Sequence, residues 1–131
     1  MRPAILFPLC LIIYGCPGAQ TRPPLEGKYE VQLIKEGAST PTKIYPPGTP
    51  KGFALELEIT NKRYRLGNAM SSFEGEVVEI SPSQVRFIML ENPSGKVEPP
   101  KEELFERSND GQMLTQIAPK TKRRIVYVRN N

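Results

Sequence analysis

A regular alternation of apolar and polar residues is the feature that most restricts how this chain can fold. Over residues 53–60, in the sequence FALELEIT, large apolar side chains occupy every second position, and the same period recurs at 29–33 and 64–66. Successive side chains of a β-strand point to opposite faces, so this pattern predicts strands with one buried and one solvated face. On a helix the same apolar residues would be scattered around the circumference. The pattern therefore predicts an all-β protein.

Further strands are expected from apolar runs between residues 77 and 128. Their alternation is less regular, as expected of strands covered on both faces or of a β-bulge, for which Gly75 is a candidate. Tight turns are predicted at Asn61-Lys62, at Ser81-Pro82-Ser83 and at Ser108–Gly111, because their residue types suit turn backbones. The Pro-rich segments, 36–51 and 91–101, are predicted to be loops, and 101–107 a possible helical turn.

About eight short antiparallel strands joined mostly by short turns are therefore expected. Such a meander has exposed edges unless it closes on itself. Eight strands are about the minimum for a barrel, whose interior holds side chains or one small ligand. The predicted fold is a single small antiparallel meander β-barrel over residues 27–131, with a two-sheet sandwich as the alternative.

The first fifteen residues have the pattern of a secretory signal peptide. One positive charge in Met1-Arg2-Pro3 precedes an uncharged, mostly apolar run over residues 4–14. Eleven residues are too few to span a bilayer as a helix, which needs about 20. A buried helix is disfavoured by the Gly and Pro residues that follow. We predict a signal peptide over residues 1–15 and a Pro-rich extended tether over 16–26.

The end of this segment, Ile13-Tyr14-Gly15-Cys16, resembles the lipobox of bacterial lipoproteins. The resemblance implies that Cys16 becomes the first mature residue and carries acyl chains that hold the protein at a bacterial membrane in the cell envelope. Cys10 would be removed with the signal peptide, so Cys16 would have no disulfide partner. Ordinary cleavage near Ala19 would instead give a secreted or periplasmic protein.

The predicted barrel resembles the lipocalin-like group of small meander barrels. Gly27-Lys28-Tyr29 is close to the Gly-x-Trp start of that family, and the last predicted strand carries Arg124, Tyr127 and Arg129. In lipocalins a late arginine packs across the aromatic residue of the first strand and closes the base of the barrel. The resemblance therefore implies a cation–π contact of Arg124 or Arg129 with Tyr29.

Two sets of residues are candidates for binding. The first consists of apolar and aromatic side chains predicted to point inward, as the barrel core or as the lining of a pocket for a small apolar ligand: Tyr29, Phe53, Leu55, Leu57, Tyr64, Phe87 and Tyr127. The second is a basic C-terminal set, for anionic headgroups or an acidic protein partner: Lys120, Lys122, Arg123, Arg124 and Arg129. The alternative for the basic set is a solvated turn and a protected edge strand.

Composition argues against catalysis and metal binding. The chain has no His, which excludes an imidazole base and the usual zinc ligands, and its only Asp is Asp110, so an Asp-rich calcium loop is absent. The glutamate pairs Glu56/Glu58 and Glu74/Glu76 are expected on wet strand faces. Export and a net charge of only +4 argue against nucleic acid. We predict an envelope lipoprotein that acts as a binding module without enzymatic activity or a cofactor, or alternatively a soluble carrier of an apolar ligand.

Overall fold

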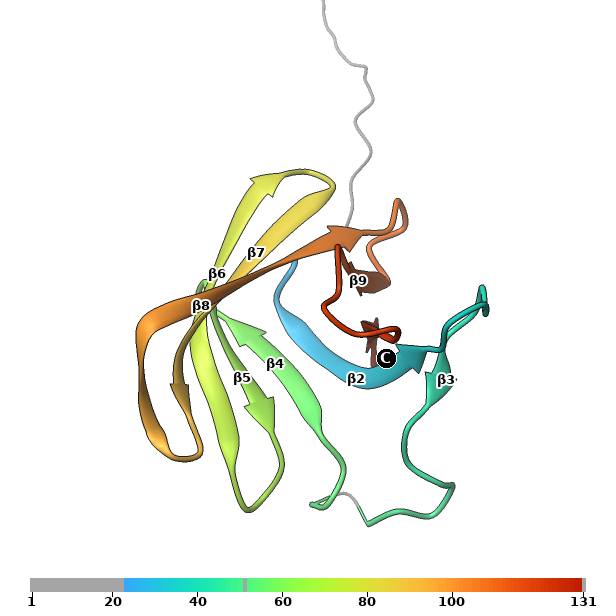
Figure 1. The fold of residues 1–131 in the computed structure, drawn as a ribbon, viewed down its shortest axis with the longest axis horizontal. Coiled ribbons are helices and arrows are strands. Elements are labelled where there is room, and N and C mark those ends of the chain that lie inside the picture. The colour runs from blue at the N-terminus through green and yellow to red at the C-terminus, as the bar shows by residue number, and fades with distance from the viewer. Residues whose placement is uncertain (1–22, 51, 131) are drawn as a thin grey trace, which may run out of the picture.

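The computed structural model describes residues 23–50 and 52–130, and all regular elements in that part of the chain are β-strands (Figure 1). The predicted signal peptide, Cys16 and most of the predicted tether lie outside the described residues. The strands are β2 (Gly27–Ile34), β3 (Thr42–Lys43), β4 (Glu56–Thr60), β5 (Arg63–Gly67), β6 (Ser72–Ser81), β7 (Gln84–Asn92), β8 (Gly95–Arg107), β9 (Met113–Gln116) and β10 (Arg124–Arg129).

Eight of the described strands form a closed antiparallel barrel. From β4 to β10 each strand pairs with the next one along the chain, β2 pairs with β4, and β10 returns to pair with β2. The closing pair runs in register from Arg124 opposite Ile34 to Arg129 opposite Tyr29. The two-residue β3 is an extra strand beside the end of β2. The predicted all-β meander barrel of about eight strands is confirmed.

Where alternation and turn chemistry agree, the structure follows the sequence. In β4, Leu57 and Ile59 are buried while Glu58 is exposed. Asn61 and Lys62 both have positive φ, 53° and 63°, in the turn that joins β4 to β5. A two-residue turn with positive φ at both positions matches the twist of the strands it connects. The predicted turn is therefore confirmed.

A register irregularity lies beside Gly75, but its extra residue is Leu90 of β7, so the prediction of a bulge in the strand that contains Gly75 is wrong at this position. The register between β6 and β7 shifts between Glu74 and Gly75. A Cβ atom on Gly75 would overlap the carbonyl oxygen of Ile88 and lie 2.9 Å from Cε1 of Tyr64. Glycine therefore permits the close approach of β7 and of the Tyr64 ring.

The strand predicted from residue 53 begins only at Glu56, and the prediction that Phe53 points into the barrel is wrong. Phe53 is 61 % exposed, and its N–H donates to the Pro50 carbonyl oxygen at 3.0 Å within a turn. The Gly52 carbonyl oxygen accepts a hydrogen bond from Ala69 N–H at 3.0 Å. The turn keeps Phe53 out of the strand pairing of β4, although its position in the sequence continues the apolar–polar alternation of that strand.

The predicted loop over 91–101 and helical turn over 101–107 are wrong, because β7 and β8 form one long hairpin. Asn92 pairs with Gly95 across a two-residue turn, in which Asn92 Oδ1 accepts a hydrogen bond from Ser94 N–H at 2.8 Å. Pro99 and Pro100 lie inside β8. Proline is tolerated on a strand edge that has no partner, and β9 pairs only with Phe105–Arg107.

Aromatic side chains fill the middle of the barrel. The rings of Tyr64, Phe87, Phe105 and Tyr127 come from four different strands, and consecutive ring centroids in this series lie 5.0 Å apart. Tyr64–Phe87 and Phe87–Phe105 meet edge to face, whereas Phe105 and Tyr127 stack. These offset and edge-to-face arrangements are the favoured aromatic geometries. The middle of the interior is thus a packed core.

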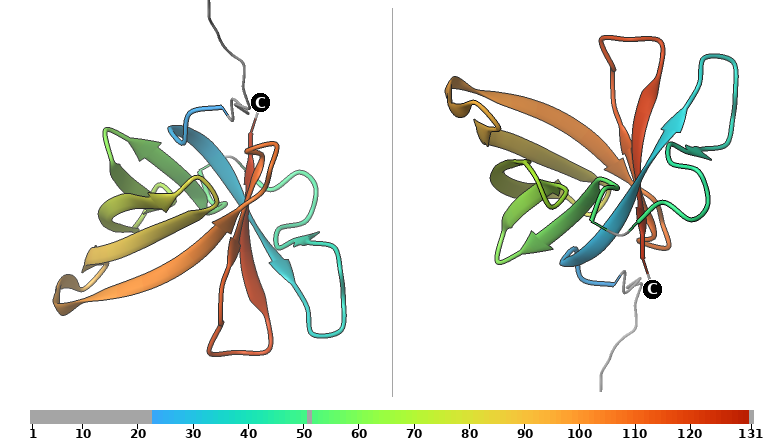
Figure 2. Two further views of the ribbon diagram at one scale, coloured as in Figure 1. Left: turned by 90° about the horizontal axis from the view of Figure 1, so that it is seen from above. Right: turned by 90° about the horizontal axis from the view of Figure 1, so that it is seen from below.

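The barrel has two different ends. At one end, here called the closed end, lie Pro23–Glu26 and the turns at 61–62, 82–83 and 108–112. At the other end, called the open end, lie the long connection 35–55 and the shorter ones at 68–71, 93–94 and 117–123. Figure 2 shows that the connections after β2 and before β10 project away from the point where the described chain starts.

Candidate functional site

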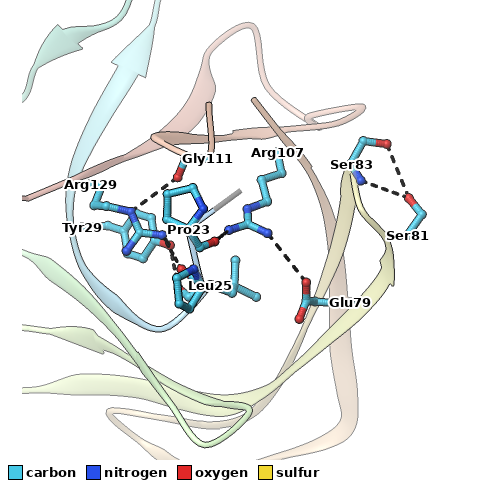
Figure 3. Close-up of polar contacts among 10 residues, drawn as sticks. Pro23, Leu25, Tyr29, Glu79, Ser81, Ser83, Arg107, Gly111 and Arg129 are labelled. Carbon is cyan, nitrogen blue, oxygen red and sulfur yellow. Dashed lines mark hydrogen bonds and ion pairs between the residues drawn. The ribbon is translucent and has the colours of Figure 1, made fainter. Parts of the chain in front are cut away.

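Arg129 organises the closed end of the barrel (Figure 3). Its Cζ atom lies 4.8 Å from the ring centroid of Tyr29, so the cation–π contact implied by the lipocalin resemblance is confirmed. Its guanidinium also donates to the Tyr29 hydroxyl at 2.8 Å, to the Pro24 carbonyl at 2.6 Å and to the Glu26 carbonyl at 3.0 Å. The Tyr29 hydroxyl in turn donates to the Leu25 carbonyl at 2.6 Å.

A second arginine, Arg107 at the end of β8, contacts the same segment. Its side chain is only 6 % exposed, donates to the Pro23 carbonyl and lies 3.7 Å from Glu79 Oε2 (Figure 3). Leu25 is buried in the core cluster. Pro23–Glu26, which we had assigned to the extended tether, therefore packs as part of the barrel and covers this end.

A pocket of about 480 Å³ lies toward the open end. Tyr64 and Phe87 belong to both the core and the pocket lining, so they form its inner, apolar part. The remaining lining comes from β7, β8 and the loop before β10: Met89, Lys101, Glu102, Glu103 and Lys120. The pocket is thus apolar at its inner end and charged at its rim.

The acidic and basic side chains of the rim differ in whether they have a hydrogen-bond or ion-pair partner. Glu103 accepts a hydrogen bond from Gln116 Nε2 at 3.0 Å, and Glu102 forms an ion pair with Arg86 at 3.4 Å. Neither Lys101 nor Lys120 has an acidic oxygen within 4.0 Å in residues 23–50 and 52–130. Two ammonium groups without an ion-pair partner in this part of the chain therefore lie at the rim, together with the carboxylate of Glu103.

Two tyrosines close to Glu103 have altered proton affinity. Burial, with a smaller contribution from the negative charge of Glu103, raises the pKa of Tyr64 to about 12. The pKa of Tyr127 is also raised, first by burial and then by Glu103 and Tyr64. Both phenols stay protonated at neutral pH, so the Tyr64 hydroxyl can donate a hydrogen bond in the pocket.

Most of the predicted inward-facing set lies in the core, and little of it lines the pocket. Tyr29, Leu57 and Tyr127 are buried, and Leu55 packs against the core while half-exposed. Sequence reasoning found Tyr64 and Phe87 but missed Met89, Lys101, Glu102, Glu103 and Lys120 as pocket residues. A strand prediction over 101–107 would have put residues 101, 103 and 105 on one face, because strand side chains alternate.

The predicted basic set divides between the two ends of the barrel. Lys120, Lys122 and Arg123 are exposed on the loop at the open end. Arg124 begins β10, and its Nη1 donates to the Gln116 carbonyl at 3.1 Å. Arg129 lies at the closed end, so it does not form one surface with the other four residues of the set.

The acidic residues of the described strands form no compact site. Glu58 lies opposite Arg65 in the register of β4 and β5, and Arg63 Nη1 lies 3.9 Å from Glu76 Oε2. Within the described part of the chain, no three His, Cys, Asp or Glu side chains gather in a way that could hold a metal ion. In the same residues, no helix has the length and apolar character needed to cross a membrane.

Comparison with known proteins gives no relative: the chain matches no family model, no curated protein and no solved structure.

Proposed function

We propose that this protein is a non-catalytic binding module whose barrel takes one small amphipathic ligand at its open end. The pocket of about 480 Å³ is the observation that carries the proposal. Small-molecule sites commonly enclose about 300–1,000 Å³ and combine an apolar lining with a few polar groups. The closed end is covered by Pro23–Glu26, so a ligand would enter from the open end.

The lining indicates the chemistry of this ligand. The rings of Tyr64 and Phe87 and the thioether of Met89 offer a surface for an apolar body. The unmatched ammonium groups of Lys101 and Lys120 favour an anionic group at the rim. A long-chain carboxylate has this combination of parts.

Binding of a dansyl-labelled fatty acid, followed by fluorescence, tests the apolar part of the site. We expect Met89→Asp, which places a charge in the pocket, to weaken binding of the probe at least about tenfold. Ile80→Asp is the matched control, because Ile80 is 43 % exposed and does not line the pocket. Circular dichroism establishes that both variants keep their strands. Equal affinities in the two variants, or no binding by the wild type, would exclude this site.

The same probe tests the role of the rim cations. We expect Lys101→Gln to weaken binding of the labelled carboxylate and to leave binding of its methyl ester unchanged. Lys96→Gln is the control, because Lys96 already pairs with Glu98 at 3.3 Å and does not line the pocket. A loss of both probes in Lys101→Gln would mean that the lysine contributes packing and that its charge does not select the ligand.

We also propose that the barrel is a lipocalin-like domain held at a bacterial membrane through acylated Cys16. The lipobox-like sequence supports the anchor, and the contact of Arg129 with Tyr29 supports the likeness to lipocalins. Intact mass of the mature protein from the membrane fraction tests the anchor: acyl additions on Cys16 are expected, and Cys16→Ala should release soluble protein. An unmodified wild type found only in the soluble fraction would favour a secreted or periplasmic carrier with the same pocket.

A further inference from the structure

Closure of the barrel brings two basic segments together that lie far apart in the sequence. Ile34 at the end of β2 is opposite Arg124 at the start of β10. The chain that follows β2 and the loop that precedes β10 therefore leave from adjacent strand ends, and Figure 2 shows them projecting side by side. Lys122 Nζ lies 3.9 Å from Glu36 Oε1, which connects the two segments directly.

These two segments, 35–43 and 120–124, are here called the basic face. They carry six basic residues and one acidic residue, a net charge of +5: Lys35, Lys43, Lys120, Lys122, Arg123, Arg124 and Glu36. The other described residues carry nine basic and thirteen acidic residues, a net charge of −4. The basic face is thus strongly positive although the rest of the described molecule is net negative, and a patch of this kind steers association toward anionic surfaces.

We propose that the basic face docks onto an anionic lipid bilayer. The cations are on long side chains, and all six of these residues are exposed. Ile44, which follows Lys43, is 41 % exposed and offers an apolar group for the headgroup region. Dispersed cations suit mobile lipid headgroups, whereas an acidic protein needs charges fixed in complementary positions.

Docking in this orientation would have a consequence for the pocket. Lys120 belongs both to the basic face and to the pocket rim. The bilayer would therefore lie next to the opening through which an amphipathic ligand enters. The docking surface itself depends neither on the proposed ligand nor on acylation of Cys16.

Co-sedimentation with vesicles tests the proposal. The exported and processed protein, carrying Cys16→Ala so that no acyl chain anchors it, is mixed with phosphatidylcholine vesicles with or without phosphatidylglycerol. We expect binding only where phosphatidylglycerol is present. We also expect binding to be lost in about 1 M salt, at which the Debye length falls to about 3 Å.

Charge-matched variants locate the surface. Removing three charges from the basic face, in Lys120→Gln/Lys122→Gln/Arg123→Gln, should weaken binding at least about tenfold. Removing three exposed charges elsewhere, in Lys28→Gln/Arg63→Gln/Arg65→Gln, should change it less than about twofold and controls for net charge. Equal losses in the two variants, binding to neutral vesicles, or binding of an acidic protein without binding to phosphatidylglycerol would each overturn the proposal.

Discussion

At the scale of single residues, the closed end depends on what a guanidinium can do and an ammonium cannot. Arg129 reaches the carbonyl oxygens of Pro24 and Glu26, the Tyr29 hydroxyl and the face of the Tyr29 ring at once. The planar group has five donors in fixed directions and stacks on aromatic rings, whereas an ammonium is a point charge with three donors. Arginine is thus the residue type that this end of the barrel requires.

We therefore expect Arg129→Lys to lower the free energy of unfolding by about 2–3 kcal/mol, although it conserves charge. Urea denaturation followed by circular dichroism measures this change. Arg123→Lys is the matched control, since Arg123 is exposed at the open end and should change stability by less than about 0.5 kcal/mol. Equal stabilities of the two variants would show that the contacts of Arg129 contribute little.

A second prediction at this scale concerns pH. Tyr64 ionises near an ordinary pKa of about 10 in the unfolded chain and at about 12 in the folded protein. Its contribution to stability is therefore complete below pH 10 and is lost as the pH rises from 10 to 12, because the unfolded chain releases the proton first. From pH 9 to pH 11 the free energy of unfolding, measured by urea denaturation, should fall in both proteins. The fall should be about 1 kcal/mol smaller in Tyr64→Phe than in the wild type. Tyr45→Phe, outside the core cluster, should follow the wild type.

At the scale of elements, strands could be predicted wherever alternation, turn chemistry and pairing agree. The hairpin of β4 and β5 has all three, and its turn at Asn61-Lys62 was predicted at the residues where it occurs. The prolines of β8 led to the prediction of a loop. Whether a proline is tolerated in a strand depends on whether a partner strand lies alongside it, and a local sequence pattern does not contain that information. Phe53 fits the alternation but is removed from the strand by a turn whose hydrogen bonds reach Ala69, sixteen residues away.

The close approach of β7 to Gly75 gives a prediction at this scale. Gly75→Ala should lower the free energy of unfolding by about 2–3 kcal/mol, because the added methyl group overlaps the backbone of β7. Gly52→Ala is the matched control: its Cβ would lie 3.5 Å from that of Ala69, an ordinary contact. Thermal and urea unfolding of the two variants would separate loss of packing space from a general effect of replacing glycine. Equal stabilities would mean that β7 shifts at little cost.

At the scale of the whole molecule, the pocket and the basic face arise from strand closure. The sequence contained the residues of both, but neither could be assembled without the pairing of β10 with β2, which decides which strand ends meet. The same pairing puts Arg129 opposite Tyr29 and far from Lys120, so the predicted basic set had to divide. Long-range register thus limits what local patterns can predict about a site.

The arrangement of the two ends also determines how an anchored molecule would be oriented. The described chain starts at Pro23 on the closed end, so only residues 17–22 would separate Cys16 from the barrel. Six extended residues reach about 19 Å, less than the roughly 26 Å covered by the eight residues of β2. An anchor at Cys16 would therefore hold the closed end near the membrane and direct the pocket away from it, so that in the anchored protein the basic face would dock onto a second, facing bilayer.

Energy transfer from a dye on the protein to an acceptor lipid tests this orientation. Acylated protein is reconstituted into phosphatidylcholine vesicles, whose neutral surface does not attract the basic face, and is labelled at Lys62→Cys or Lys122→Cys. Lys62 lies in a turn at the closed end and Lys122 in a loop at the open end. We expect strong transfer from position 62 and weak transfer from position 122, since the rate falls steeply with distance. Stronger transfer from position 122 would mean that the open end faces the anchoring membrane, and the basic face would then dock onto the bilayer that holds Cys16.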